Sequence, residues 1–386
     1  MLGLKRRVVV LTEIIAPYRI PVFNALAVLP EIDLHVIFLS ETDPSLRQWH
    51  VYKDEIKFSY EVLPGWRRRL GKYNCLLNWR VGKSLQRAHP ELVVCGGYSY
   101  LAAWRAAAWT RQNEVPLLLW SESTALDARR HRRPVEAMKR KFCKMCVAFV
   151  APGTAARNYL ISLGAPECAI FLAPNAVDVD FYARAAARAR QCVGEIRSRY
   201  SLPARYFLFV GRLVREKGVL DLLEAYSALD EATRSQVGLV FAGDGAARSQ
   251  LRSRAAGIRA GMVRFAGWLH REQIPEIYAL ADALVFPTYS DPWGLVVNEA
   301  MACGLPVLVS EAAGCVPDLV ENCGNGLRLP VGDVKALVQA MQNLSSNSEL
   351  RLRMGTQSGE RIRAYTPEAC AQGMAKAVKY ACGAVI

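Results

Sequence analysis

The sequence predicts an α/β protein built from two domains, each a parallel β-sheet covered by helices. Short runs of β-branched and other apolar residues alternate with helical stretches along the chain, as expected for parallel sheets with helical crossovers. The chain has 386 residues, and domains usually contain roughly 100–200, so two domains are expected. Hydrophobic residues make up 52% of the chain, which is enough to form two packed cores and excludes a disordered protein.

The candidate strands are short and apolar, and helical stretches lie between most of them. The first half of the chain contains seven: Arg7–Thr12, Leu34–Leu39, Phe58–Leu63, Glu91–Cys95, Pro116–Trp120, Val147–Ala151 and Ile170–Leu172. The second half contains six: Tyr206–Val210, Gly238–Ala242, Met262–Ala266, Asp282–Pro287, Pro306–Ser310 and Gly326–Leu329.

The domain division falls at the turn-forming segment 173–178, which a polar stretch rich in alanine and arginine follows. We therefore expect a first domain over 1–175 and a second over 176–365, with a cleft between two doubly wound sheets. Residues 347–382 are predicted to be helical, and the last helix, within 366–386, is expected to return to the first domain. In open α/β sheets, ligands bind beyond the carboxyl ends of the strands, so the informative residues should follow each strand.

Composition excludes several other classes of protein. No apolar run reaches the roughly 18–20 residues that a membrane-spanning helix requires. The basic start of the chain resembles a signal peptide, but Glu13 interrupts the apolar region and no small-residue cleavage site follows. The 11 cysteines include one C-x-x-C pattern, at Cys143 and Cys146, with no second pair at zinc spacing. We expect reduced thiols, no metal and a cytoplasmic protein.

A loop with two glycines and two cations follows the strand at 206–210. Its sequence, from Gly211 to Gly218, places Arg212 and Lys217 five residues apart, just before a predicted helix. A guanidinium fork, an ammonium and free N–H groups at a helix start suit a diphosphate. An ordinary charged surface loop is the alternative. After the next strand, Gly243-Asp244-Gly245 forms a turn whose backbone could approach a ligand closely.

The segment after the strand at 282–287 offers two carboxylates and a helix start. Asp291 lies in the loop, and Glu299 lies more than one turn into the predicted helix among apolar neighbours, which predicts a semi-buried position. Carboxylates accept hydrogen bonds from sugar and ribose hydroxyls, and free N–H groups near the helix start can bind a phosphate. The donor-side candidates in this segment, besides the two acids, are Trp293, Gly294, Leu295 and Val296.

Four motifs occur in order over residues 206–345: Gly-Arg-Leu-x-x-x-Lys-Gly, Ala-Gly-Asp-Gly, Arg-Phe-x-Gly and Asp-x-x-Gly-Leu-x-x-x-Glu-Ala-Met-Ala-x-Gly-x-Pro-Val. This combination resembles the retaining nucleotide-sugar glycosyltransferases of family four. The resemblance implies the GT-B fold, with two Rossmann-like domains facing across a cleft. It also implies that Arg212 and Lys217 bind the donor diphosphate, that Glu299 binds the ribose and that Asp291, where most members have Glu, contacts the donor sugar. The backbone near Leu269 would contact the base.

The first half resembles the family less, although one subgroup begins with a similar Pro-Tyr-Arg-x-Pro-Val-Phe segment. This would place Tyr18 and Arg19 opposite the donor, whereas a plain helix start is the alternative. Gly97 and Glu122 follow two further strands. We name Glu122 as the first-domain candidate for contacting the acceptor or the reacting centre, with helix capping as the alternative.

The net charge of +14 is concentrated in residues 1–175, which contain 25 Lys/Arg and 14 Asp/Glu. With nearby tryptophans, the basic runs could form a surface for an anionic membrane, and a solvated charged face is the alternative. No nucleic-acid motif accompanies the charge, so no nucleic-acid partner is expected. The basic runs are Arg67–Arg69, Arg129–Arg133 and Lys139–Lys141, and the nearby tryptophans are Trp66, Trp79, Trp104 and Trp109.

These observations predict a hexosyltransferase that uses a nucleotide diphosphate sugar, needs no cofactor, and acts on a saccharide or lipid-linked hydroxyl acceptor in bacterial surface-polysaccharide assembly. Peripheral association with the inner face of the cell membrane is expected. The catalytic candidates are Arg212, Lys217, Asp291 and Glu122. The alternatives are a nucleotide-sugar epimerase or phosphorylase of the same fold, and a non-catalytic basic module that binds membrane or nucleic acid. A hydride-transferring enzyme is disfavoured because no Gly-x-Gly-x-x-Gly follows the first strand.

Overall fold

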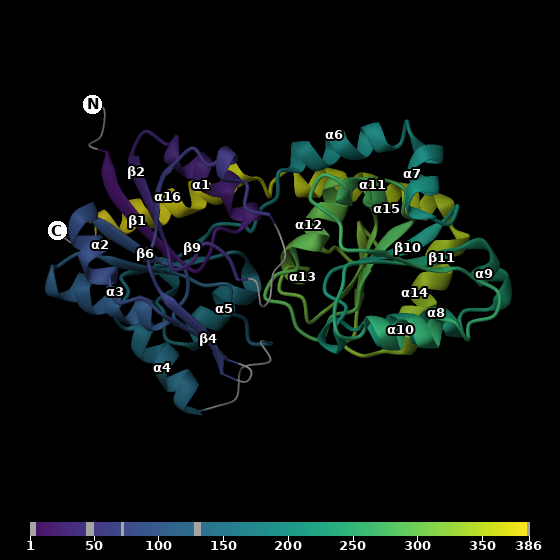
Figure 1. The fold of residues 1–386 in the computed structure, drawn as a ribbon, viewed down its shortest axis with the longest axis horizontal. Coiled ribbons are helices and arrows are strands. Elements are labelled where there is room, and N and C mark those ends of the chain that lie inside the picture. The colour runs from purple at the N-terminus through teal and green to yellow at the C-terminus, as the bar shows by residue number, and fades with distance from the viewer. Residues whose placement is uncertain (1–4, 44–49, 71–72, 127–132, 384–386) are drawn as a thin grey trace. The chain divides into compact units, whose positions relative to one another are not determined.

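The structure is a computed structural model that describes residues 5–43, 50–70, 73–126 and 133–383. It divides the chain into two compact units. Unit 1 comprises Met1–Ala125, Arg129–Ala176 and Thr366–Ile386, and unit 2 comprises Leu126–Ala128 and Val177–Tyr365. The α/β class is confirmed, because each unit contains a parallel sheet with helices on both faces (Figure 1).

The sheet of unit 1 has the strand order β3-β2-β1-β6-β7-β8-β9, with every neighbouring pair parallel. Its strands are β1 (Arg6–Thr12), β2 (Ile32–Phe38), β3 (Ser59–Val62), β6 (Leu92–Cys95), β7 (Leu117–Trp120), β8 (Ala148–Ala151) and β9 (Ile170–Leu172). A separate antiparallel hairpin consists of β4 (Trp66–Leu70) and β5 (Tyr73–Leu77), which the sequence analysis did not predict.

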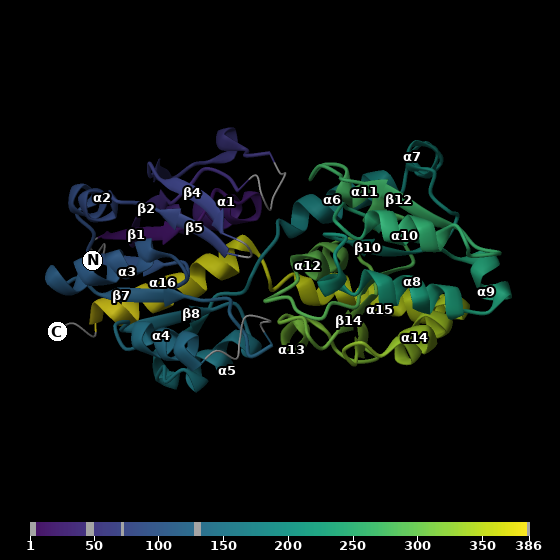
Figure 2. The ribbon, with the colours of Figure 1, turned by 60° about the horizontal axis from the view of Figure 1, so that its bottom comes forward.

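Helices cover both faces of this sheet because its central strands are apolar on both sides. One face packs against α1 (Ile20–Ala27) and α16 (Pro367–Gly383), and the other packs against α2 (Val81–Ala88), α3 (Leu101–Gln112), α4 (Arg133–Cys143) and α5 (Thr154–Ser162). Figure 2 shows α16, in yellow, lying among the purple and blue elements of unit 1. The final helix therefore contributes to the core formed by the N-terminal part of the chain.

The sheet of unit 2 has the order β12-β11-β10-β13-β14-β15, again entirely parallel. The reversal of strand order lies between β10 and β13, and in such sheets this switch point is where ligands bind. The strands are β10 (Tyr206–Val210), β11 (Gly238–Ala242), β12 (Val263–Gly267), β13 (Ala283–Phe286), β14 (Val307–Ser310) and β15 (Gly326–Leu329).

The helices of unit 2 also form two layers (Figure 1). One layer contains α8 (Val219–Ala228), α9 (Glu231–Gln236), α10 (Arg248–Ala255) and α14 (Val334–Ser346); the other contains α6 (Val179–Ala189), α11 (Ile274–Ala279), α12 (Leu295–Ala302) and α15 (Ser348–Ile362). Two further helices, α7 (Val193–Tyr200) and α13 (Val316–Leu319), complete the unit.

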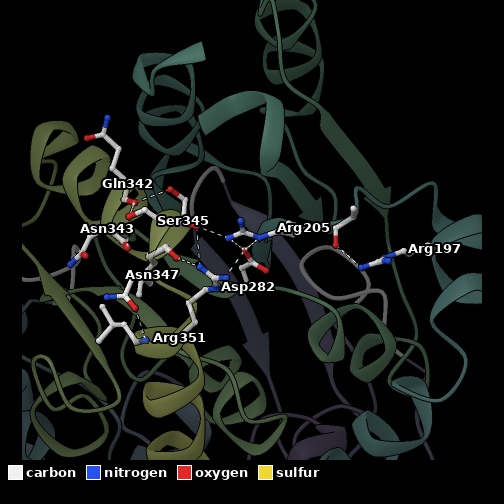
Figure 3. A network of polar contacts seen from close by, with 12 residues as sticks. Arg197, Arg205, Asp282, Gln342, Asn343, Ser345, Asn347 and Arg351 are labelled. Atoms are coloured by element: carbon white, nitrogen blue, oxygen red, sulfur yellow. Dashed lines mark hydrogen bonds and ion pairs between the residues drawn. The ribbon is translucent and has the colours of Figure 1, made fainter. Parts of the chain in front are cut away.

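An ion-pair network fixes the amino ends of the two central strands of unit 2 (Figure 3). Asp282 precedes β13, and its Oδ2 accepts a hydrogen bond of 2.9 Å from Nε of Arg205, which precedes β10. Arg351 of α15 approaches the same oxygen to 3.8 Å. Both arginines also donate to the carbonyl of Ser345 at the end of α14. The network thus joins two strands and two helices.

Replacing Asp282 with asparagine is expected to lower the free energy of unfolding by about 3 kcal/mol, because it leaves two partly buried guanidiniums without a counter-charge. Glu321 is the matched control, since it forms an exposed ion pair with Arg361 at 3.0 Å in the same unit. Glu321→Gln should cost less than about 1 kcal/mol. Urea unfolding measures both, and equal effects would show that the Asp282 network contributes no more than a surface pair.

Candidate active site

The loop from Gly211 to Gly218, which carries Arg212 and Lys217, follows the carboxyl end of β10 and leads into α8. The turn contains a short 3₁₀ helix, Arg215–Lys217, followed by Gly218 with φ of 67°. A Cβ on Gly218 would lie 2.0 Å from the carbonyl oxygen of Pro287, so glycine is required where this turn meets the loop after β13. Arg212 is exposed, and its guanidinium has no hydrogen-bond or ion-pair partner among the described residues.

Lys217 and Asp291 form a partly buried ion pair. The Lys217 Nζ lies 2.6 Å from Asp291 Oδ2 and donates to the carbonyl oxygen of Ser290 at 3.0 Å. The second carboxylate oxygen, Oδ1, accepts a hydrogen bond of 3.0 Å from the backbone N–H of Trp293. The two side chains are 12% and 21% exposed, so screening by water is limited. The structure therefore brings together two residues that are 74 positions apart in the sequence.

Backbone bonds hold this pair in place. The Thr288 hydroxyl, fully buried, donates to the carbonyl of Glu216, and the N–H of Tyr289 donates to the same carbonyl at 2.9 Å. Asp291 itself forms a bridge to Ala313 beyond β14. The loops after three neighbouring strands thus fix the position of the Lys217–Asp291 pair.

Helix α12 begins directly after this loop. Gly294 has φ of 96°, which favours glycine, and a Cβ there would approach Phe286 to 3.1 Å. Leu295 and Val296 are the first residues of α12, and N–H groups at a helix start lack acceptors within the helix. The helix start therefore presents positive partial charge beside the Lys217–Asp291 pair.

Glu299 lies in the second turn of α12 in a semi-buried position, as the sequence predicted. Tyr278 of α11 donates a hydrogen bond of 3.0 Å to Glu299 Oε2, and the phenol of Tyr182 of α6 lies near enough to this carboxylate to lower its pKa. Burial raises the pKa of Glu299 to about 7, while the two phenols act in the opposite direction. Both tyrosines are buried and were not identified from the sequence.

The Gly243-Asp244-Gly245 turn packs closely against the loop that follows β10. A Cβ on Gly243 would lie 2.0 Å from the carbonyl oxygen of Gly211, and one on Gly245 would lie 2.5 Å from that of Leu213. Gly211, Gly243 and Gly245 all have positive φ. The Asp244 carboxylate accepts from the Gly245 N–H and from Arg248, so both its oxygens have partners within the turn.

Two donor-side candidates have buried side chains. Trp293 is 3% exposed, and its indole N–H donates to Asn298 at 2.8 Å. The ring therefore packs in the core, and the backbone N–H of Trp293 donates to Asp291. Leu269 is also buried, at 8% exposure, just beyond the end of β12.

In unit 1, Arg19 and Glu122 form an ion pair although 103 positions separate them. Arg19 follows β1 and its guanidinium carbon lies 3.7 Å from the ring centroid of Trp120, the last residue of β7. Tyr18 precedes Arg19 in the same 3₁₀ turn, and its ring centroid lies 5.6 Å from that carbon. Gly97, with φ of 104°, follows β6, and no atom beyond its chain neighbours lies within 4 Å of the position that a Cβ would occupy. The residues expected on the acceptor side thus lie at the carboxyl ends of β1, β6 and β7.

The structure contradicts part of the prediction that the basic runs form a membrane-facing surface. Arg67 points inward: its side chain is 18% exposed and ion-pairs with Asp43 at 2.5 Å. Lys139 is buried, and its ammonium contacts Glu136 and the Tyr159 hydroxyl. Of the run at 129–133, only the last arginine lies within the described residues. The side chains of the two arginines that follow Arg67 also lie outside the described part of the chain.

The C-x-x-C pair does not form a reactive site. Burial raises the pKa of Cys143 to about 11, and burial also raises the pKa of Cys146. A thiolate, the reactive form, is therefore disfavoured. Within the described ranges, no group of three or more His, Cys, Asp or Glu side chains could hold a metal ion. None of the described helices is both long enough and apolar enough to cross a membrane.

Comparison with known proteins agrees with this architecture. Residues 196–361 match the family model described as Glycosyl transferases group 1, and residues 30–181 match that described as Glycosyltransferase Family 4. A crystal structure of Anabaena Alr3699/HepE in complex with UDP superposes with a TM-score of 0.74 at 19% identity, over 97% of this chain and 100% of that one. The chain therefore has the GT-B fold, and each half of it matches a glycosyltransferase family model.

Two curated relatives match over shorter stretches. A D-inositol 3-phosphate glycosyltransferase of Corynebacterium jeikeium is 31% identical over 222 residues, which are 55% of this chain and 52% of the relative. An O-antigen chain mannosyltransferase B of Escherichia coli is 32% identical over 148 residues, 37% of this chain and 38% of the relative. The chain thus spans about half or less of the length of these relatives.

Proposed function

We propose that this protein transfers a hexosyl group from a nucleotide diphosphate sugar to a hydroxyl acceptor, with retention of anomeric configuration. The observation that carries the proposal is the arrangement at the sheet switch point of unit 2. There, Lys217 and the start of α12 lie beside Asp291, with Glu299 one turn further along the same helix. The glycosyltransferase models matched by both halves of the chain support it.

In this proposal the diphosphate is the leaving group, and cations stabilise the charge that develops on it. A lysine ammonium has three N–H donors, and in Lys217 two are directed at Asp291 and Ser290. The third can bind a diphosphate oxygen, and the exposed Arg212 supplies a second cation. Preorganised donors directed at developing charge are among the largest contributions to catalysis. Two cations and the helix start provide this stabilisation without a metal.

The carboxylates bind the rest of the donor. Each oxygen of Asp291 has one described partner and can accept a further hydrogen bond from a sugar hydroxyl. Glu299 accepts from the Tyr278 phenol and retains lone pairs for the ribose hydroxyls. Aspartate is one methylene shorter than glutamate, so the loop that carries Asp291 must lie nearer to the sugar. The hydrogen bond from the Trp293 N–H to Asp291 holds the carboxylate in this position.

On the acceptor side, we propose that Arg19 and Glu122 position the attacking hydroxyl. Glu122→Ala should lower kcat/KM for the acceptor about 10- to 100-fold, in the range of a lost general-base or positioning interaction, and should leave the affinity for UDP unchanged. Initial rates at varied acceptor concentration and calorimetric titration of UDP measure the two quantities. Glu91 is the matched control, because its ion pair with Arg6 lies at the amino ends of the strands of the same sheet, whereas Glu122 lies at the carboxyl ends. A Glu122 variant that behaves like Glu91→Ala would rule out this role.

For the acceptor we propose a lipid-linked saccharide in surface-polysaccharide assembly, with the protein on the inner face of the membrane. The excess of positive charge in residues 1–175 and the exposed Trp66 and Trp79 support this. Co-sedimentation with phosphatidylglycerol vesicles, compared with phosphatidylcholine vesicles, tests the association. A preference for soluble acceptors without vesicle binding would contradict it.

The activity is tested by a thermal-shift screen against UDP-, GDP- and ADP-sugars, followed by incubation of the best donor with acceptor saccharides. We expect one donor to raise Tm and a product whose anomeric configuration, read by NMR, equals that of the donor. An epimerised donor in the absence of acceptor would favour an epimerase, and no saturable binding would contradict a transferase.

A further inference from the structure

Glu299 has an unusual environment for a carboxylate in a semi-buried position. Among the residues that the structure describes, it forms no ion pair; Tyr278 donates a hydrogen bond of 3.0 Å to it, and the nearby phenol of Tyr182 lowers its pKa. A carboxylate that leaves water without a cation requires hydrogen-bond donors. Three helices supply this arrangement, since Glu299 lies on α12, Tyr278 on α11 and Tyr182 on α6.

The two phenols have little freedom to bind elsewhere. Tyr278 is fully buried, and its hydroxyl lies 3.0 Å from Glu299 Oε2 and 3.3 Å from the carbonyl oxygen of Val296. Tyr182 is 6% exposed. Buried hydroxyls retain a hydrogen-bond partner in folded proteins, so the phenols and the carboxylate fix one another's orientation. The remaining lone pairs of Glu299 are thereby left for an external donor.

We propose that Tyr182 and Tyr278 are positioning residues that hold the Glu299 carboxylate for the ribose hydroxyls of the donor. This inference rests on the proposed function of the same site. Two neutral donors orient the carboxylate and leave its charge uncompensated, and a charged acceptor forms the stronger hydrogen bond with a hydroxyl. An arginine or lysine at either position would instead neutralise it.

The test compares UDP with its 2′-deoxy and 3′-deoxy analogues by calorimetric titration at several pH values. The ratio of the deoxy analogue's Kd to that of UDP reports only the lost hydroxyl, because titration of the phosphates affects both ligands alike. In the native protein at pH 8 we expect a ratio of about ten or more for at least one analogue, in the range of a hydrogen bond to a charged group. The ratio should fall toward one as Glu299 becomes protonated, with a midpoint near its pKa of about 7.

Tyr278→Phe and Tyr182→Phe remove only the hydroxyls. Because the two phenols lower the pKa of Glu299, each variant should move the midpoint to higher pH and reduce the ratio at pH 7.5 at least about threefold. Tyr226→Phe is the matched control: this tyrosine of unit 2 is also buried, and its hydroxyl donates to Val237 and accepts from the N–H of Met262. Its ratio and midpoint should equal those of the native protein.

The outcomes separate the inference from the function on which it rests. If Glu299→Gln abolishes the hydroxyl preference but both Tyr→Phe variants keep the native ratio and midpoint, the positioning role is wrong and the donor site stands. If Glu299→Gln itself leaves the preference unchanged, the ribose assignment is wrong. If UDP does not bind, GDP and ADP with their deoxy analogues replace it, and failure of all three contradicts the proposed function.

Discussion

Replacing Lys217 with alanine is expected to lower kcat by about two to three orders of magnitude, the range seen when one preorganised donor to a developing charge is removed. Lys217 is held against Asp291 and Ser290 before any donor binds, so its ammonium is already positioned for the leaving diphosphate. The variant loses this cation and leaves Asp291, 21% exposed, with an uncompensated negative charge next to that diphosphate. Both changes oppose departure of the leaving group.

Transfer rates at saturating donor measure this effect, and circular dichroism establishes that the variant is folded. Lys217→Met is a second variant that keeps an apolar stem near the ring of Phe286, whose centroid lies 5.6 Å from the ammonium, and it should lose as much activity. Lys335→Ala, an exposed lysine on α14, should retain native activity. A Lys217→Ala protein with near-native kcat would rule out the role in stabilising the leaving group.

Replacing Glu299 with glutamine should have opposite effects on function and stability. Glutamine keeps the shape but presents a neutral acceptor, so we expect the KM for the donor to rise on the order of 10- to 100-fold, as for the loss of a hydrogen bond to a charged group. The folded-state pKa of Glu299, about 7, lies above the ordinary value of 4.5, so the folded state binds this proton more tightly than the unfolded state. Stability therefore falls as pH rises from about 4.5 to about 7 and is lowest above that range.

The glutamine variant lacks this titration and should be more stable than the native protein at pH 8. The rise in the pKa of Glu299 from 4.5 to about 7 corresponds to about 3 kcal/mol of stability at the high-pH limit. At pH 4 both proteins carry a neutral group and the difference should vanish. Urea unfolding at the two pH values measures it. A variant that is less stable than the native protein at pH 8 would show that Glu299 does not carry a destabilising charge in the free protein.

Much of the fold follows from local sequence pattern, because most strands of the two parallel sheets are buried, apolar runs. The β4–β5 hairpin was missed because its first strand is the arginine run after Trp66, which has the composition of a charged surface segment. A glycine between two short runs, at Gly71, was the available signal. The inward direction of Arg67 depends on Asp43, a tertiary partner that no local pattern indicates.

The candidate site also contains residues that the sequence could predict and residues that it could not. Residues at strand ends were predictable, since the carboxyl ends of parallel strands share one edge, and the pairing of Arg19 with Glu122 illustrates this. Tyr182 and Tyr278 were not predictable, because each lies within a helix and reaches Glu299 only through the packing of α6 and α11 around α12. The packing of Gly243 against the backbone of Gly211 was not predictable for a related reason, because sequence spacing does not reveal it.

The claim that Lys217 and the start of α12 form a diphosphate site is tested most directly by calorimetric titration of UDP, GDP and ADP, each against its monophosphate. We predict that one diphosphate binds the native protein at least about tenfold more tightly than its monophosphate, as expected for one charge-assisted hydrogen bond, and that Lys217→Ala removes most of this preference. Equal affinity for the diphosphate and the monophosphate in the native protein, or an unchanged preference in the variant, would contradict the claim.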